Sequence, residues 1–116
     1  MSLPRSLRFA SRGEVKDLLR RGERLVTPLG RVVWVRARRR KGRILFVVST
    51  RVSKRATVRN RIKREFDGWL TRHARWPLEA DAMVFVNPAV LERSARARRS
   101  LLEETLNRLR RCVPRR

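Results

Sequence analysis

The chain has 116 residues, 41% of them hydrophobic, which suits one domain with a modest core and much exposed surface. Its 32 Lys and Arg residues outnumber its 10 Asp and Glu residues, and the net charge of +22 indicates a polyanionic partner. The single cysteine, Cys112, excludes an intrachain disulfide and fits a reducing cytoplasm, and residues 1–10 lack the apolar run of a signal peptide or membrane span.

The first half of the chain predicts one helix followed by strands. Ser11 and Glu14 have the spacing of a capping box, and apolar residues recur at helical spacing before Gly22, so we expect a helix over residues 11–21. Valine-rich stretches predict strands over residues 29–37 and 44–50, joined as a hairpin with a basic turn at its tip. Residues 25–35 could hold one long strand or two short ones.

The second half predicts two helices around one strand. An apolar stripe predicts a helix over residues 56–75, and the residue before Pro77 should end it. A strand should follow Asp81 over residues 82–86, and a last helix should run from residues 91–94 to about 111. The order α-β-β-α-β-α indicates a single α+β domain over residues 1–116, with a small mixed sheet, three helices and flexible ends at 1–10 and 112–116.

The most informative stretch is residues 51–64, where seven of fourteen residues are Arg or Lys and none is acidic. On a helix, Val58 and Ile62 face the core while Asn60 and Arg64 lie on the opposite side. Arginine suits phosphate because its planar guanidinium can donate two parallel hydrogen bonds. A merely solvated basic face is the alternative, which the lack of any balancing carboxylate disfavours.

Residues 59–64, Arg-Asn-Arg-Ile-Lys-Arg, resemble the signature of the bacterial ribonuclease P protein family, and residues 48–56 resemble the strand and connection that precede it. Gly22, Trp34 and Asp81 stand in matching places of the wider pattern. The resemblance implies a left-handed βαβ crossover that carries the signature helix. It also implies a subunit that assists Mg²⁺-dependent removal of the 5′ leader from precursor tRNA, with hydrolysis performed by the RNA subunit.

The resemblance assigns two sets of contact residues. Those expected to bind the ribonuclease P RNA are Lys54, Arg55, Arg59, Asn60, Arg61, Lys63 and Arg64. Those expected to bind the leader, in a cleft between the first helix and the sheet, are Val15, Leu19, Trp34 and Arg51. Without the resemblance, Trp34 would be interpreted as a core aromatic. The family commonly has aromatics where Val15 and Leu19 stand, a Lys at Thr50 and an Arg at Asp67, which leaves the leader and metal contacts open.

Other functions remain possible from the sequence. A non-catalytic basic RNA-binding protein, such as a ribosomal protein or RNA chaperone, could use the same kind of fold. A membrane-active cationic protein is disfavoured, because the basic cluster shares a helix with an ordinary core stripe. We expect no catalytic residue, metal ligand or small-molecule substrate for the protein itself. The basic turn at residues 36–43 and the C-terminal arginines could be further RNA contacts or solvated segments.

Overall fold

The structure is a computed structural model that describes residues 12–37, 42–72 and 79–113. Within these ranges the chain forms three α-helices, one 3₁₀-helix and four strands, which confirms the predicted α+β class. No helix in the described ranges is long and apolar enough to cross a membrane. In chain order the elements are α1 (Arg12–Arg21), β1 (Glu23–Val26), β2 (Gly30–Arg36), β3 (Ile44–Val47), α2 (Ala56–Arg72), β4 (Ala80–Val86), η2 (Pro88–Glu92) and α3 (Ala95–Cys112).

The strands form one mixed sheet in the order β1-β2-β4-β3. β1 and β2 make an antiparallel hairpin, so residues 25–35 belong to two strands rather than one. β4 runs antiparallel to β2, and β3 lies at the edge, parallel to β4. β3, α2 and β4 therefore form a βαβ unit, and the left-handedness that the resemblance implies for it stays a prediction.

The predicted hairpin of residues 29–37 and 44–50 is wrong, because β4 lies between β2 and β3. β4 is seven residues long, and most of its side chains are buried on one or the other face of the sheet. A strand that is apolar on both faces is stabilised by a neighbour on each side and a cover on each face. β3 is only four residues long and takes the edge.

The turn between β1 and β2 depends on a glycine. Gly30 has a φ of +152°, and a Cβ atom added there would lie 1.9 Å from the Phe85 carbonyl oxygen. The Thr27 hydroxyl donates a hydrogen bond to the Gly30 carbonyl oxygen at 2.5 Å. It also accepts one from the buried Thr105 hydroxyl of α3 at 3.1 Å, which ties this turn to the last helix.

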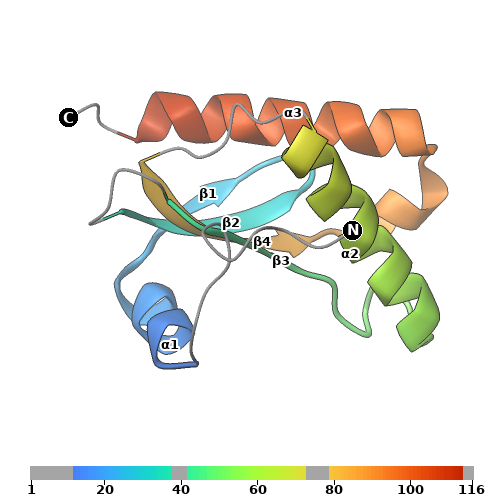
Figure 1. Ribbon diagram of the computed structural model, residues 1–116, viewed down its shortest axis with the longest axis horizontal. Coiled ribbons are helices and arrows are strands. Elements are labelled where there is room, and N and C mark those ends of the chain that lie inside the picture. The colour runs from blue at the N-terminus through green and yellow to red at the C-terminus, as the bar shows by residue number, and fades with distance from the viewer. Residues whose placement is uncertain (1–11, 38–41, 73–78, 114–116) are drawn as a thin grey trace.

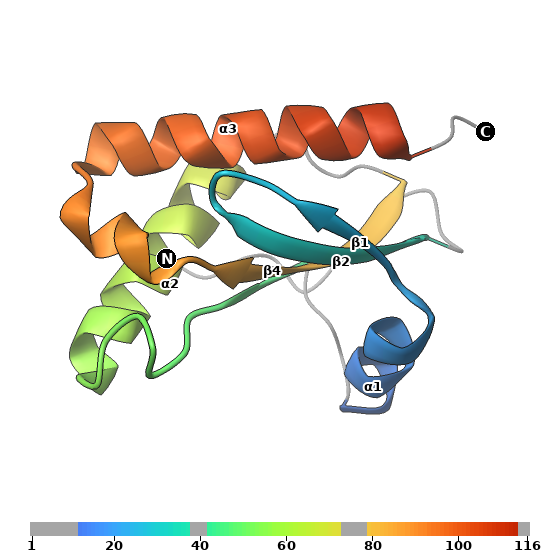
Figure 2. The same cartoon turned by 180° about the vertical axis from the view of Figure 1, so that it is seen from behind.

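Helices cover the two faces of the sheet unequally. Figures 1 and 2 show α3 lying along one face of the sheet and α1 on the opposite face. The main core lies between the sheet and the helices α2 and α3, and burying each large side chain there contributes about 1.5–3 kcal/mol. Its largest fully buried side chains are Phe46, Phe66, Leu29, Ile44, Ile62, Leu70, Leu102 and Leu109.

A second, smaller core lies under α1. Leu18 is buried there against Val33 of β2 and Met83 of β4. The helix ends as predicted, since the Gly22 amide donates to the Leu18 carbonyl oxygen at 2.7 Å. Because this core is small, α1 covers only part of its face of the sheet.

Other boundaries differ from the prediction by a few residues. β3 ends at Val47 rather than at residue 50, β4 begins at Ala80 rather than at residue 82, and α3 begins at Ala95 rather than within 91–94. Ser94 caps α3, its hydroxyl accepting the Ala97 amide at 3.1 Å. α2 is described to Arg72, and the predicted end near residue 75 lies outside the described residues. Cys112 belongs to α3, and Val113 is buried in the main core, so a flexible tail starting at residue 112 is wrong for these two positions.

Candidate nucleic-acid interface

Helix α2 is anchored by one apolar side. Ile62, Phe66 and Leu70 are each 1% exposed, and the rings of Phe46 and Phe66 lie 5.3 Å apart, centroid to centroid. The neighbouring Trp69 is also buried. The rotation of the helix about its axis is thereby fixed, and so is the side that it presents to solvent.

The outward side of α2 and the connection before it carry the predicted cluster. In the described residues, none of its cations lies within ion-pair distance of a carboxylate, whereas Arg20, Arg21, Arg43, Arg98 and Arg108 all do. The cluster is therefore an exposed region of uncompensated positive charge, suited to phosphates. Its exposed members are Arg51, Lys54, Arg55, Asn60, Arg61, Lys63 and Arg64.

Arg59 differs from the other residues of the cluster. Its guanidinium Nη1 donates to the carbonyl oxygens of Ser53 and Lys54, at 2.9 and 3.0 Å. The side chain is half-buried and connects the helix to the segment that precedes it. Arg59 therefore fixes the backbone that carries Lys54 and Arg55, and only the rest of its guanidinium is available to a ligand.

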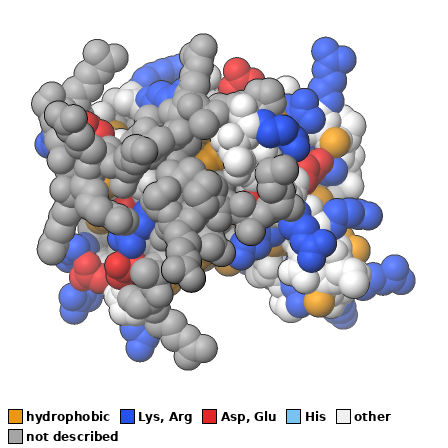
Figure 3. Space-filling model, viewed as in Figure 1, with side chains coloured by type: hydrophobic (Ala, Val, Ile, Leu, Met, Phe, Trp, Pro, Cys, Tyr) orange, Lys and Arg blue, Asp and Glu red, His pale blue; other side chains and the backbone are white. Residues whose placement is uncertain are grey.

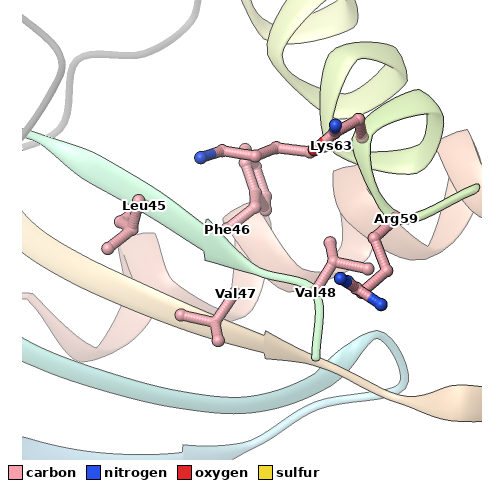
Figure 4. Close-up of a pocket in the computed structure, with 7 residues that line it drawn as sticks. Leu45, Phe46, Val47, Val48, Arg59 and Lys63 are labelled. Atoms are coloured by element: carbon pink, nitrogen blue, oxygen red, sulfur yellow. The ribbon is translucent and has the colours of Figure 1, made fainter. Parts of the chain in front are cut away.

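A depression of about 320 Å³ lies between the edge strand β3 and α2 (Figure 4). The half-buried Val48 provides apolar surface, and the long side chains of Arg59 and Lys63 flank it, while Phe46 lies buried beneath. Apolar surface bordered by cations suits a base or sugar with its phosphate. Its lining residues are Leu45, Phe46, Val47, Val48, Arg59, Asn60 and Lys63.

The predicted leader-binding residues do not gather in one place. Val15 packs against the smaller core under α1, and Leu19 is 37% exposed on the same helix. Arg51 is exposed in the connection after β3. Trp34 is 6% exposed and belongs to the main core on the opposite face of the sheet.

The expected position of Trp34 beside α1 is therefore wrong. Side chains alternate along a strand, and its neighbours Val33 and Val35 pack on the α1 side. Trp34 must then point toward α2 and α3, as a core aromatic does. It offers no ring face to an unpaired base in this structure.

Phe85 is the aromatic residue on the α1 side that the sequence reasoning missed. It is half-buried at the part of the sheet that α1 leaves uncovered, and the Arg31 guanidinium carbon lies 5.2 Å from its ring centroid. Together they offer a flat, cationic surface on which a base can stack. Alternation along the predicted strand of residues 82–86 already puts Phe85 on the same face as Met83; what the sequence lacked was the knowledge that this face meets α1.

The position of α1 is set by an ion-pair cluster at the root of β3. The Arg43 guanidinium contacts the Glu14 carboxylate at 2.7 Å and the Asp81 carboxylate at 3.3 Å. The Arg43 amide also donates to Asp81 at 2.9 Å. Burial opposes the charge of Arg43, but the hydrogen bonds to Glu14 and Asp81 prevail and raise its pKa above the usual value.

No group of three or more His, Cys, Asp or Glu side chains that could hold a metal ion occurs in residues 12–37, 42–72 and 79–113. What the described surface offers instead is fixed positive charge beside small apolar areas. Such a surface can bind, position and neutralise a polyanion.

Comparison with known proteins identifies the family. Residues 3–110 match the model of the family described as Ribonuclease P. A mutant RNase P protein of Staphylococcus aureus with defective mRNA degradation activity is similar in structure, with a TM-score of 0.78, 19% identity, and 88% of this chain and 86% of that chain covered. The RNase P protein from Thermotoga maritima gives a TM-score of 0.73 at 24% identity, with 90% and 96% covered.

At these identities the solved structures show the shared fold. No curated protein matches the chain in sequence. The family model nevertheless covers most of the 116 residues and includes the basic helix and most of the final helix. The chain therefore belongs to the ribonuclease P protein family, the protein subunit of an endoribonuclease of tRNA processing.

Proposed function

We propose that this subunit binds the catalytic RNA of ribonuclease P through the outward side of α2 and the connection before it. The observation that carries the proposal is a set of exposed cations that no carboxylate of the described ranges compensates, on a helix whose other side is buried in the core. Six or more phosphate contacts of this kind supply strong, salt-dependent binding to a folded RNA. The residues proposed to make them are Lys54, Arg55, Arg59, Asn60, Arg61, Lys63 and Arg64.

The 5′ leader of precursor tRNA is proposed to lie on the α1 side of the sheet. Phe85 with Arg31 takes the stacking role that Trp34 cannot fill, and Val15 and Leu19 border this surface from α1. Single-stranded RNA is commonly held by aromatic rings next to cations, because every base has a flat face. The surface therefore favours an extended, unpaired segment over a duplex.

The Mg²⁺ ions of the reaction are proposed to be held mainly by the RNA subunit. The protein contributes by neutralising phosphates that would otherwise repel one another around those ions. Less Mg²⁺ should then be needed to fold the RNA and bind the substrate. A cytoplasmic location, where tRNA precursors of bacteria arise, agrees with this role.

The test is a cleavage assay at low Mg²⁺ with a bacterial ribonuclease P RNA and a precursor tRNA. We expect the protein to stimulate release of the leader, and to bind that RNA more tightly than bulk tRNA under the same salt conditions. If cleavage is not stimulated and both RNAs bind equally, the protein is a general RNA binder of the same fold. This combined outcome, with no stimulated cleavage and no preference for ribonuclease P RNA, would refute the proposal.

A further inference from the structure

The start of α3 carries a second group of exposed arginines, apart from the α2 cluster. Arg93, Arg96 and Arg99 are exposed, and in the described residues none of them lies within ion-pair distance of a carboxylate. Glu92 and Glu103 are the nearest acidic residues along the chain, and both are exposed and have no ion pair with any described residue. We call Arg93, Arg96 and Arg99 the α3 arginines.

Helix stability does not explain the α3 arginines. The first turn of α3 contains no acidic residue, although the helix dipole favours acids at that end and disfavours cations. Arg98 lies between Arg96 and Arg99 and is paired with Glu65, whereas Arg96 and Arg99 contact no acid within the part of the chain that the structure describes. Their charge therefore opposes folding slightly and indicates an external anion.

A rigid connection fixes the α3 arginines relative to α2. The guanidinium of Arg98 contacts both carboxylate oxygens of Glu65 on α2, from Nε at 2.7 Å and from Nη2 at 3.0 Å. Its Nη1 donates to the carbonyl oxygens of Arg93 and Val90, at 2.6 and 3.3 Å. Because Arg98 neutralises the Glu65 carboxylate in this bidentate pair, Glu65 does not compensate the cations of α2 or the α3 arginines.

The two groups of cations lie on the same side of the molecule. Figure 3 shows Lys and Arg side chains gathered on its right-hand side, where Figure 1 places the N-terminal half of α2, η2 and the start of α3. A polymer that lies on the outward side of α2 can therefore reach the start of α3 as well. The far end of α3, at Cys112, lies on the opposite side of the molecule.

The chemistry of the α3 arginines indicates phosphates rather than bases. Residues 88–112 contain no aromatic side chain, which a surface for unpaired bases would be expected to offer. Arginines on a rigid pair of helices match phosphates that are themselves held at fixed positions, as in a duplex. Flexible single strands would gain less from such a fixed arrangement.

We propose that the α3 arginines bind the sugar–phosphate backbone of a double-stranded segment of the RNA subunit, next to the segment held by α2. This inference rests on the proposed function. It adds a second contact to the RNA-binding surface and leaves the leader-binding surface unchanged. The Glu65–Arg98 pair sets the distance between the two contacts.

A matched pair of double variants tests the proposal. Arg96→Gln with Arg99→Gln and Arg110→Gln with Arg111→Gln remove two charges each from the same helix, at opposite ends. The dissociation constant for ribonuclease P RNA is measured against salt concentration. Each lost phosphate contact makes the slope of log K against log salt less steep by about 0.7–0.9. The slope should therefore become less steep by roughly 1.5 for the variant at residues 96 and 99, and should hardly change for the variant at residues 110 and 111.

A third variant separates charge from structure. Arg96→Lys with Arg99→Lys keeps both charges and should keep most of the wild-type slope. Phosphate-ethylation interference identifies the phosphates whose modification weakens binding. The interference signal in a paired segment of the RNA should disappear with the Gln variant at residues 96 and 99, and should remain with the other two variants. Equal slopes for the two Gln variants, or a lost segment that is unpaired, would overturn the proposal.

The outcome stays separate from that of the proposed function. If wild-type protein binds ribonuclease P RNA no better than bulk tRNA, the proposed function fails. The comparison of the two Gln variants can then be made on tRNA, which also contains duplex segments. A difference in slope there would keep the α3 arginines as a duplex-binding surface, and no difference would refute it.

Discussion

The guanidinium of Arg43 lies 2.7 Å from the Glu14 carboxylate and so joins the start of β3 to α1. The same guanidinium contacts Asp81, which stands opposite Val35 in the register of β2 and β4. Because Leu18 is the only buried residue of α1 among those described, this contact does much to set the tilt of the helix. It therefore sets the width of the surface between α1 and the uncovered part of the sheet.

Replacing Arg43 should destabilise the fold measurably. The side chains of Arg43 and Asp81 are 13% and 16% exposed, so Arg43→Met leaves a largely buried carboxylate without its charged partner. We expect the free energy of unfolding to fall by about 2–3 kcal/mol, less than for a fully buried pair because water still reaches Glu14. Urea denaturation of the wild type and the variant measures this change in the free energy of unfolding. Arg20→Met, which breaks an exposed pair with Asp17, should change it by no more than about 0.5 kcal/mol; equal effects would contradict the anchoring role.

Leader binding should depend on Phe85 and not on Trp34. The leader contribution is the difference in binding free energy between precursor tRNA and mature tRNA. Phe85→Leu keeps an apolar side chain but removes the ring, and should reduce this contribution by about 1–3 kcal/mol. Trp34→Phe should lower the free energy of unfolding by about 1–3 kcal/mol through a core cavity and leave the leader contribution unchanged. The readout is the affinity of the holoenzyme for precursor tRNA relative to mature tRNA. A leader contribution that falls with Trp34→Phe alone would restore the original assignment.

Local patterns predicted much of the fold, and long-range pairing caused the errors. The apolar stripe of α2, the stop at Gly22 and the basic stretch around Asn60 are properties of neighbouring residues, and the structure confirms all three. The place of β4 between β2 and β3 depends on which strands pair across the chain, which no local pattern contains. The prediction put Trp34 on the wrong side of the sheet. Alternation along a strand tells which residues share a face, but it does not tell which helix covers that face.

The arginines of the signature helix should separate into two kinds. Arg61→Ala and Arg64→Ala remove exposed charges and should weaken RNA binding, each lowering the salt slope by about 0.7–0.9, with little change in melting temperature. Arg59→Ala also removes the hydrogen bonds to Ser53 and Lys54 and should cost about 1–3 kcal/mol of stability. Thermal unfolding and binding are measured on the same samples. A melting temperature as low for Arg61→Ala as for Arg59→Ala would make Arg61 structural.

Asp17 should titrate below its ordinary value. The hydrogen bond from Arg21 is the largest cause that lowers its pKa from 3.8, and Arg20 adds to it. A lowered pKa means that the carboxylate stabilises the fold above the unfolded-state value, and that this contribution disappears as the pH falls through the folded-state value. The carboxyl chemical shift of Asp17 in an NMR titration measures it. Arg21→Gln should move the midpoint back toward 3.8, and an unchanged midpoint would refute the assigned cause.

The protein alone should not cleave RNA. In the proposed function the RNA subunit performs the hydrolysis, and the described surface of the protein offers fixed positive charge that binds and positions phosphates. The cations of α2 are suited to binding and neutralising phosphates through charge and hydrogen bonds. We therefore expect RNA-free protein to leave precursor tRNA intact with and without Mg²⁺, and cleavage to appear on adding ribonuclease P RNA. Activity that follows the RNA-free protein through successive columns, and persists after ribonuclease-inhibitor treatment, would show a catalytic site in the protein itself.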